Sequence, residues 1–230
     1  QEISGEIACN GVYFPQVTIQ NRGTNTINTV SFDYQYNGTP LNYVWNGTLN
    51  SLESTTIDLP QIVTTSGAYY LNVTATMSND ENLSNNQSST LFYVNTAGTV
   101  GVVNNFENGT PNLISYNQVG QDQLWQKGVS TKTLLNTASS GNQVYATNLS
   151  GNYPDDTTAY LVSQCYDLSH VVNPVIKFNL AFDLQNSRDL LYMQYSTDFG
   201  ANWDTLGTAS DVNWYNSFSV PSATGGGCVN

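Results

Sequence analysis

The feature that most constrains the fold is a succession of short runs, between residues 16 and 94, in which apolar and polar residues alternate. In the run 29–36, Val30, Phe32 and Tyr34 fall on one face, and the pair Asn37-Gly38 follows. Alternation with a period of two indicates half-buried strands, and Asn-Gly is a strong hairpin signal. We therefore expect an antiparallel β-sandwich here. The other runs cover 16–21, 41–47 (closed by a second Asn-Gly turn signal), 54–60, 68–77 and 88–95.

The second half of the chain repeats this character with longer and more apolar runs. No segment shows a sustained helical period with caps, so the chain is expected to be all-β throughout. Between residues 95 and 105 the alternation is lost and small residues dominate, which predicts a boundary near residue 97. We divide the chain into domains 1–96 and 97–230 and expect a jelly-roll sandwich in the second. Its predicted strands cover 112–119, 143–149, 158–168, 174–184, 189–197 and 214–220.

Charge and composition exclude several classes of partner. Only 10% of the residues are charged, the formal net charge is -12, and there are five lysines and arginines. Five cations cannot neutralise a nucleic-acid backbone, and the acidic balance disfavours anionic membranes. No apolar run approaches the roughly 18 residues of a membrane span, so we expect no membrane insertion. A surface rich in Asn, Thr, Ser and Tyr is typical of secreted or cell-surface β proteins.

Residues 1–10, QEISGEIACN, are not expected to be a signal peptide. A charged region followed by an apolar stretch is missing there. We expect either that a leader was removed or that the sequence is an internal segment of a longer chain.

Residues 8–95 resemble the bacterial cell-adhesion-related Ig-like domain. The matching features are the early segment Val17–Gly23 and a late hairpin containing Asp80, Asn82, Asn85 and Asn86. The resemblance implies an Ig-like sandwich that serves as an adhesion module or spacer, without catalytic residues.

Residues 105–220 resemble the MAM and cleaved-adhesin type of jelly roll found in secreted proteins of Bacteroidetes-type bacteria. The matching features are Phe106-Glu107, the strand 160–169, and the pattern D.LY.QYSTD.G..W..LG at 189–207. The resemblance implies a neighbouring metallopeptidase domain and a type IX secretion sorting domain in the parent protein. Family members often continue in further strands, so it leaves open whether the sandwich is complete at residue 230.

The stretch STDFGANW at 196–203 also resembles the Asp-box of sialidases. Sialidases clamp the substrate carboxylate with three arginines, whereas this chain has only Arg22 and Arg188. We therefore interpret the motif as a structural turn. In this turn Asp198 accepts backbone N–H groups, Gly200 takes a positive φ and Trp203 packs back on the sheet.

The content of histidine and the lack of a serine-nucleophile motif disfavour other classes of enzyme. The one histidine, His170, excludes an HExxH zinc site, and no G-x-S-x-G motif presents a nucleophilic serine. We interpret His170 as an exposed turn residue and predict that this segment is not an enzyme.

Two binding hypotheses remain. The jelly-roll resemblance implies a structural Ca²⁺ near the first strand, with Glu107 as a ligand and Asp155 and Asp156 as further carboxylates on a loop. Oxygen ligands from separated loops suit Ca²⁺; the alternative is that these acids are solvated. Trp125 lies in an apparent loop and is a candidate to stack on a sugar ring; the favoured alternative is that it packs in the core or at an edge of the sandwich.

Three cysteines, Cys9, Cys165 and Cys228, allow at most one intrachain disulfide. Either Cys228 has a partner beyond residue 230, or the three cysteines are free buried thiols.

These features together predict a non-catalytic adhesion or ligand-binding segment of a larger secreted or cell-surface protein. Its expected partners are a host or matrix protein, a glycan, or other domains of the parent chain. The alternatives are an accessory C-terminal region of a secreted metallopeptidase and a carbohydrate-binding module.

Overall fold

The computed structural model describes residues 6–108, 113–117, 124–212 and 214–216, and the all-β prediction is confirmed. The one helical element within these residues is a 3-10 turn, η1 (Leu83–Asn85). No helix in the described part of the chain is long and apolar enough to cross a bilayer. The chain divides into two compact units, the first ending at Thr96 and the second beginning at Ala97.

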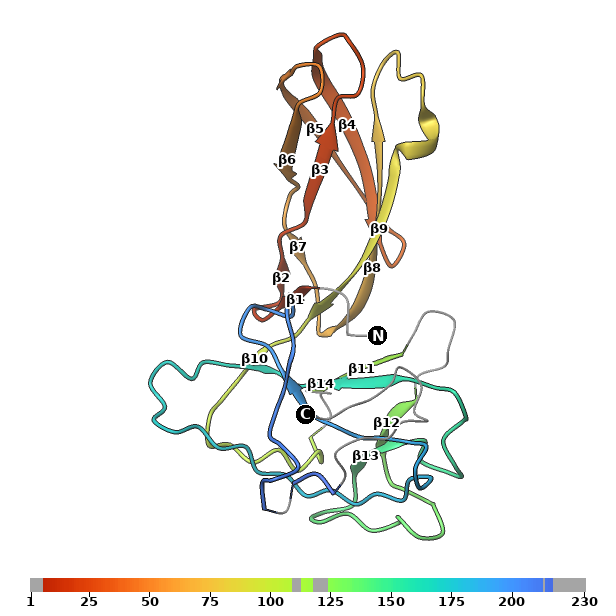
Figure 1. Ribbon diagram of the computed structural model, residues 1–230, viewed down its shortest axis with the longest axis vertical. Helices are drawn as coiled ribbons and strands as arrows, with labels where there is room; N and C mark the ends of the chain where they lie inside the picture. The colour runs from red at the N-terminus through yellow and green to blue at the C-terminus, as the bar shows by residue number, and fades with distance from the viewer. Residues whose placement is uncertain (1–5, 109–112, 118–123, 213, 217–230) are drawn as a thin grey trace. The chain divides into compact units, whose positions relative to one another are not determined.

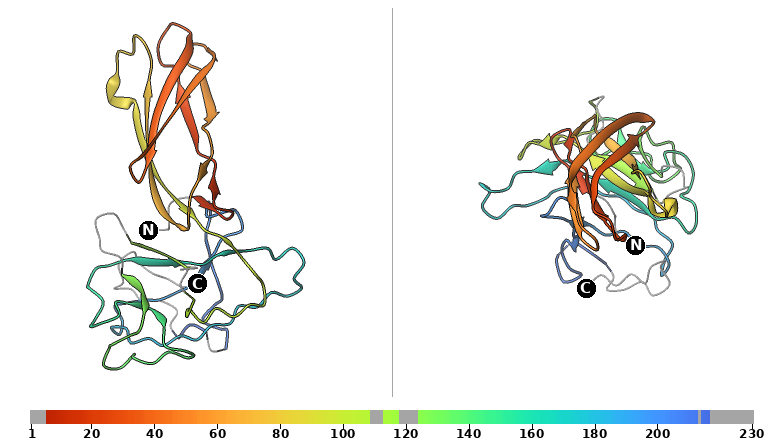
Figure 2. Two further views of the ribbon diagram at one scale, coloured as in Figure 1. Left: turned by 180° about the vertical axis from the view of Figure 1, so that it is seen from behind. Right: turned by 90° about the horizontal axis from the view of Figure 1, so that it is seen from above.

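The first unit is a sandwich of two layers, which Figures 1 and 2 show from opposite sides. One layer is a five-stranded sheet in the order β1-β9-β8-β4-β5, antiparallel except for the parallel pair β1 and β9. The other layer consists of the antiparallel pairs β3-β6 and β2-β7. The strands are β1 (Glu6–Ala8), β2 (Val12–Tyr13), β3 (Gln16–Gln20), β4 (Ile27–Tyr36), β5 (Thr39–Leu49), β6 (Ser54–Asp58), β7 (Ile62–Val63), β8 (Gly67–Thr76) and β9 (Gln87–Val94).

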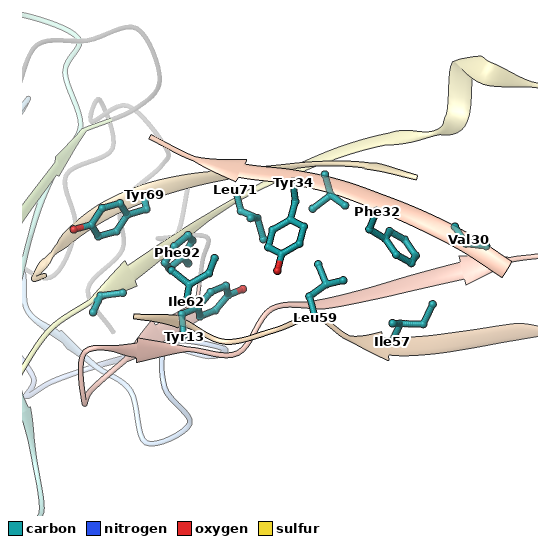
Figure 3. Close-up of a cluster of buried hydrophobic side chains, with 12 residues drawn as sticks. Tyr13, Val30, Phe32, Tyr34, Ile57, Leu59, Ile62, Tyr69, Leu71 and Phe92 are labelled. Atoms are coloured by element: carbon teal, nitrogen blue, oxygen red, sulfur yellow. The ribbon is translucent and has the colours of Figure 1, made fainter. Parts of the chain in front are cut away.

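The alternating side chains of these strands build one core between the two layers (Figure 3). Phe32 from β4 and Phe92 from β9 are fully buried. The ring of Phe92 stacks on Tyr13 of the opposite layer, with 4.1 Å between centroids, and on Tyr69 at 5.4 Å. Ile57, Leu59 and Ile62 complete the core from the β6–β7 side.

The two Asn-Gly pairs have different roles. Asn37 and Gly38 have φ angles of 45° and 79° and form the two-residue turn that joins β4 to β5, as predicted. The prediction of a turn at Asn46-Gly47 is wrong, because β5 continues through these two residues to Leu49. Gly47 instead leaves room for the ring of Trp45, since a Cβ there would lie 2.3 Å from Trp45 Cζ2.

The second unit consists of four short strand pairs within its described residues. β10 and β15 are parallel, and β11-β14, β12-β13 and β16-β17 are antiparallel. The buried apolar residues here are Ile114, Leu124 and Val162. The strands are β10 (Ala97–Gly98), β11 (Ile114–Asn117), β12 (Trp125–Gly128), β13 (Val144–Thr147), β14 (Ala159–Val162), β15 (Cys165–Tyr166), β16 (Gln194–Tyr195) and β17 (Asp204–Thr205).

Several strands predicted for this unit are shorter than expected or missing. The run 189–197 contains only the two residues of β16, and the run 174–184 contains no strand at all. Most of the predicted strand 214–220 lies outside the described residues. The run 174–184 alternates as a strand should, but it has no hydrogen-bonded neighbour among the described residues to make it one.

Cys9 is in a disulfide bond and so is Cys165, so the alternative of three free thiols is wrong. Cys228 lies outside the described residues.

Candidate interaction surface of the second unit

The second unit exposes a row of large apolar side chains between residues 175 and 184, which we call the apolar segment. Its exposed fractions are far above those of a core strand: Val175 76%, Ile176 54%, Phe178 45%, Leu180 51% and Phe182 52%. Ile176, Phe178, Leu180 and Phe182 share one face if the segment is extended, because side chains alternate along a strand. Figure 1 draws this segment without a strand arrow.

A turn and a pair of aromatic residues hold the apolar segment in the unit. After Leu184 the chain reverses at Gln185, whose carbonyl accepts the N–H groups of Arg188 and Asp189. The ring of Phe178 contacts Trp214 edge-on, with 5.6 Å between centroids. The Trp214 indole donates to the Leu206 carbonyl at 2.8 Å, so the segment is tied to the hairpin that carries β16 and β17.

The hairpin itself contains the Asp-box stretch. Asp198 Oδ1 accepts the Asn202 N–H at 2.9 Å and the Ser196 hydroxyl at 2.9 Å, and Oδ2 accepts the Asn202 side-chain amide at 2.6 Å. Gly200 has a φ of 88°, and its carbonyl accepts the Trp203 indole N–H at 3.1 Å. These donors therefore all find their acceptors within the motif.

These hydrogen bonds lower the pKa of Asp198 below its ordinary value of 3.8, chiefly through Asn202 and then Ser196. A lowered pKa means that the charged form stabilises the folded hairpin above pH 3.8 and that this stabilisation is lost as the pH falls through the folded pKa. We expect Asp198→Asn to accelerate hydrogen exchange of the Asn202 amide at neutral pH. The difference from the parent should shrink at pH values below 3.8. Nuclear magnetic resonance exchange rates measure this, and equal rates in both proteins at neutral pH would contradict it.

The carboxylate of Glu107 is a second acidic group that accepts backbone hydrogen bonds. Its Oε1 accepts the N–H groups of Asn142 and Gln143 at 2.8 and 2.7 Å, which lower the pKa of this carboxyl. Gly141 has a φ of 63°, and a Cβ there would lie 2.3 Å from Glu107 Oε1. Glycine therefore permits the loop 141–143 to close on the carboxylate.

The structure does not assemble the predicted calcium ligands into a cluster. Asp155 and Asp156 lie exposed on their loop, and Asp156 has a φ of 52°. No group of three His, Cys, Asp or Glu side chains suited to a metal occurs among the described residues. Calcium binding therefore stays a prediction, and the contact shown for Glu107 is with backbone amides.

The remaining candidate residues are placed as follows. Trp125 is half-buried in β12, opposite Thr147 of β13, rather than in a loop. His170 is exposed in a turn.

Sequence reasoning missed the two buried asparagines. Asn21 and Asn95 are 2% and 0% exposed. The Asn21 side chain donates a hydrogen bond to the Leu49 carbonyl, and the Asn95 side chain accepts one from the Ser66 hydroxyl. The signal for Asn21 was present, because it belongs to the early segment that carries the Ig-like resemblance.

Comparison with known proteins finds similar solved structures, among them two of a CARDB domain. No protein family and no curated protein matches the sequence. The first structure is a crystal structure of a CARDB domain of Pyrococcus furiosus in complex with di-metal ions. It is 20% identical with a TM-score of 0.34, covering 40% of this chain and 86% of that domain. The second is a solution structure of a CARDB domain from the same organism, 20% identical with a TM-score of 0.33, covering 40% and 88%.

Neither structure bears on the MAM-type resemblance or on a Bacteroidetes origin, which stay predictions.

Proposed function

We propose that the chain is a non-catalytic adhesion or ligand-binding segment of a larger cell-surface or secreted protein. The first unit serves as a spacer and the second carries the binding surface. The observation that supports this assignment is the apolar segment, where closely spaced large apolar side chains are 45% to 76% exposed. Isolated exposed apolar residues are ordinary, but a continuous group of them marks an interaction site.

The packing of the two units supports the division of roles. The first unit buries its alternating aromatic and aliphatic residues in one continuous core, as a spacer requires. The second unit leaves comparable residues exposed, and burying a Phe or Ile side chain contributes about 1.5–3 kcal/mol. A protein partner that covers the apolar segment would gain this free energy.

The test is a binding assay with the full chain against immobilised matrix proteins and a glycan array. We expect the double variant Ile176→Ser with Phe182→Ser to weaken binding by about tenfold or more, because two side chains lose their burial. The matched control is Val103→Ser with Leu134→Ser, which removes two apolar side chains that are 87% and 75% exposed elsewhere in the unit. Equal binding by both double variants would refute the assignment of this surface.

Calcium binding by Glu107, Asp155 and Asp156 needs a test that separates it from the Glu107 backbone contact. Glu107→Gln weakens that contact whether or not a metal binds, so it does not discriminate. We expect a chelator to lower the melting temperature of the parent, and to leave unchanged that of a variant carrying Asp155→Asn and Asp156→Asn. Calorimetry of the full chain measures this, and a chelator without effect on the parent would remove calcium from the description.

Two other assignments stay predictions. Glycan binding through Trp125 is tested by Trp125→Ala on the same glycan array, where unchanged binding would end the idea. The role of an accessory region beside a metallopeptidase is tested by the neighbouring sequence of the parent protein, where an upstream HExxH motif would support it.

A further inference from the structure

We propose that the apolar segment pairs antiparallel with the same segment of a second copy of this chain, about a two-fold axis at Leu180. The inference rests on the proposed function in one respect, since both treat this segment as a protein-binding surface. It goes further in naming the occupant, the geometry and the register.

The first step is the unused backbone of the segment. Residues 175–184 make no backbone hydrogen bond to any other described residue. Their apolar side chains nevertheless alternate, as in a half-buried strand. A strand with open N–H and C=O groups is a template for pairing with another chain, and strand addition obtains its affinity from main-chain hydrogen bonds.

The second step is the charge pattern. Lys177 and Asp183 are the two charged residues of the segment, and neither forms an ion pair within the described part of the chain. They lie three residues on either side of Leu180. An antiparallel self-pair centred on Leu180 therefore places Lys177 of each copy directly opposite Asp183 of the other, twice per dimer.

The third step is the apolar face in the same register. Phe178 then lies opposite Phe182, and Ile176 lies opposite Leu184. Aromatic and aliphatic pairs thus occupy this face, on which Leu184 is half-buried and the other three residues are exposed. Directly opposed side chains in an antiparallel pair lie about 4.5–5.5 Å apart at Cβ and stabilise it. The segment is thus complementary to itself in charge and in apolar character.

Other registers lose this match. A slip by one residue places the apolar side chains opposite the polar ones. Moving the two-fold axis to Asn179 places Lys177 opposite Ala181, and moving it to Ala181 places Lys177 opposite Gln185. Both leave Lys177 and Asp183 of each copy without a charged partner, so the register centred on Leu180 is favoured.

The experiment is sedimentation velocity on the full chain over a range of concentrations, with the parent, Lys177→Asp, Asp183→Lys and the double variant. We expect the parent to dimerise. Each single variant should dimerise roughly tenfold more weakly, because two symmetry-related attractive pairs become repulsive. The double variant restores opposite charges in both pairs and should recover the parent's dimerisation.

A mixture of the two single variants gives the sharpest result. Lys177→Asp in one copy faces Asp183→Lys in the other, while the unchanged Asp183 and Lys177 face each other, so the mixture should form a heterodimer more strongly than either variant forms a homodimer. The control pair is Arg22→Asp and Glu81→Lys, exposed charges of the first unit, which should leave dimerisation unchanged. A mixture no more associated than its components would overturn the register.

The parent remaining monomeric at about 100 μM would overturn the proposal as a whole. That outcome is distinct from failure of the proposed function. A monomeric parent that still binds an immobilised partner through Ile176 and Phe182 would leave the binding surface in place and remove only the second copy as its occupant.

Discussion

Replacing Phe92 by alanine is expected to lower the unfolding free energy of the first unit by about 4 kcal/mol, the range for a buried Phe. Phe92 is 0% exposed, and its ring stacks on Tyr13 from the opposite layer and on Tyr69 from the neighbouring strand. Deleting the ring opens a cavity between the two layers, where β9 cannot move inward without breaking its pairing with β8.

The measurement is hydrogen exchange by mass spectrometry on the full chain, with peptides from β4 and β8 reporting on the first unit. A loss of about 4 kcal/mol corresponds to a thousandfold decrease in protection of globally exchanging amides. Phe14→Ala is the matched control, since Phe14 is 66% exposed and its removal should change stability by less than about 0.5 kcal/mol. Similar exchange in the two variants would contradict the assigned core.

The second large effect is expected at Asn21. Its side chain donates to the carbonyls of Leu49 and Asn25 at 3.0 and 2.8 Å, and it accepts the Gly23 N–H at 2.9 Å. Asn21→Ala leaves these groups without their partner at a site that is 2% exposed. We expect a loss of about 2–3 kcal/mol, the cost of unsatisfied buried polar groups.

Thermal unfolding of the full chain and exchange of β4 and β5 peptides measure the Asn21 effect. Asn25→Ala is a suitable control, because Asn25 is exposed and contributes only its backbone carbonyl to the contact. Asn21→Asp should also be destabilising, since a carboxylate cannot donate to the two carbonyls. If Asn21→Ala were as stable as Asn25→Ala, the side chain would not be the link between these loops.

The first unit was predictable because its local and nonlocal signals agree. The long strands β4, β5, β8 and β9 alternate in sequence and also have hydrogen-bonded neighbours. The strands β1, β2 and β7 were not predicted, because two or three residues are too few to show a period. The error at Asn46-Gly47 has a specific cause. The glycine is needed because the Trp45 ring occupies the space beside Gly47, and the Asn-Gly pair alone does not reveal this contact.

In the second unit, a run of alternating apolar and polar residues is not always a hydrogen-bonded strand. The run 174–184 has the pattern of a strand, but pairing depends on which segment lies beside it, and the sequence pattern does not specify that. The sequence likewise did not specify which groups the acidic side chains contact. Sequence identified Glu107, Asp155 and Asp156 as a possible group, whereas the contacts of Glu107 are with the amides of Asn142 and Gln143, which any two residues could provide.

The parallel pairing of β1 with β9 has a mechanical consequence. Glu6, Ile7 and Ala8 lie beside Phe92, Tyr93 and Val94, and the Asn95 N–H donates to the Ala8 carbonyl. Because these first and last strands run in the same direction, tension on the two ends of the unit pulls them past each other. The bonds between them are then loaded together in shear rather than opened one after another, which suits a module that transmits pulling force.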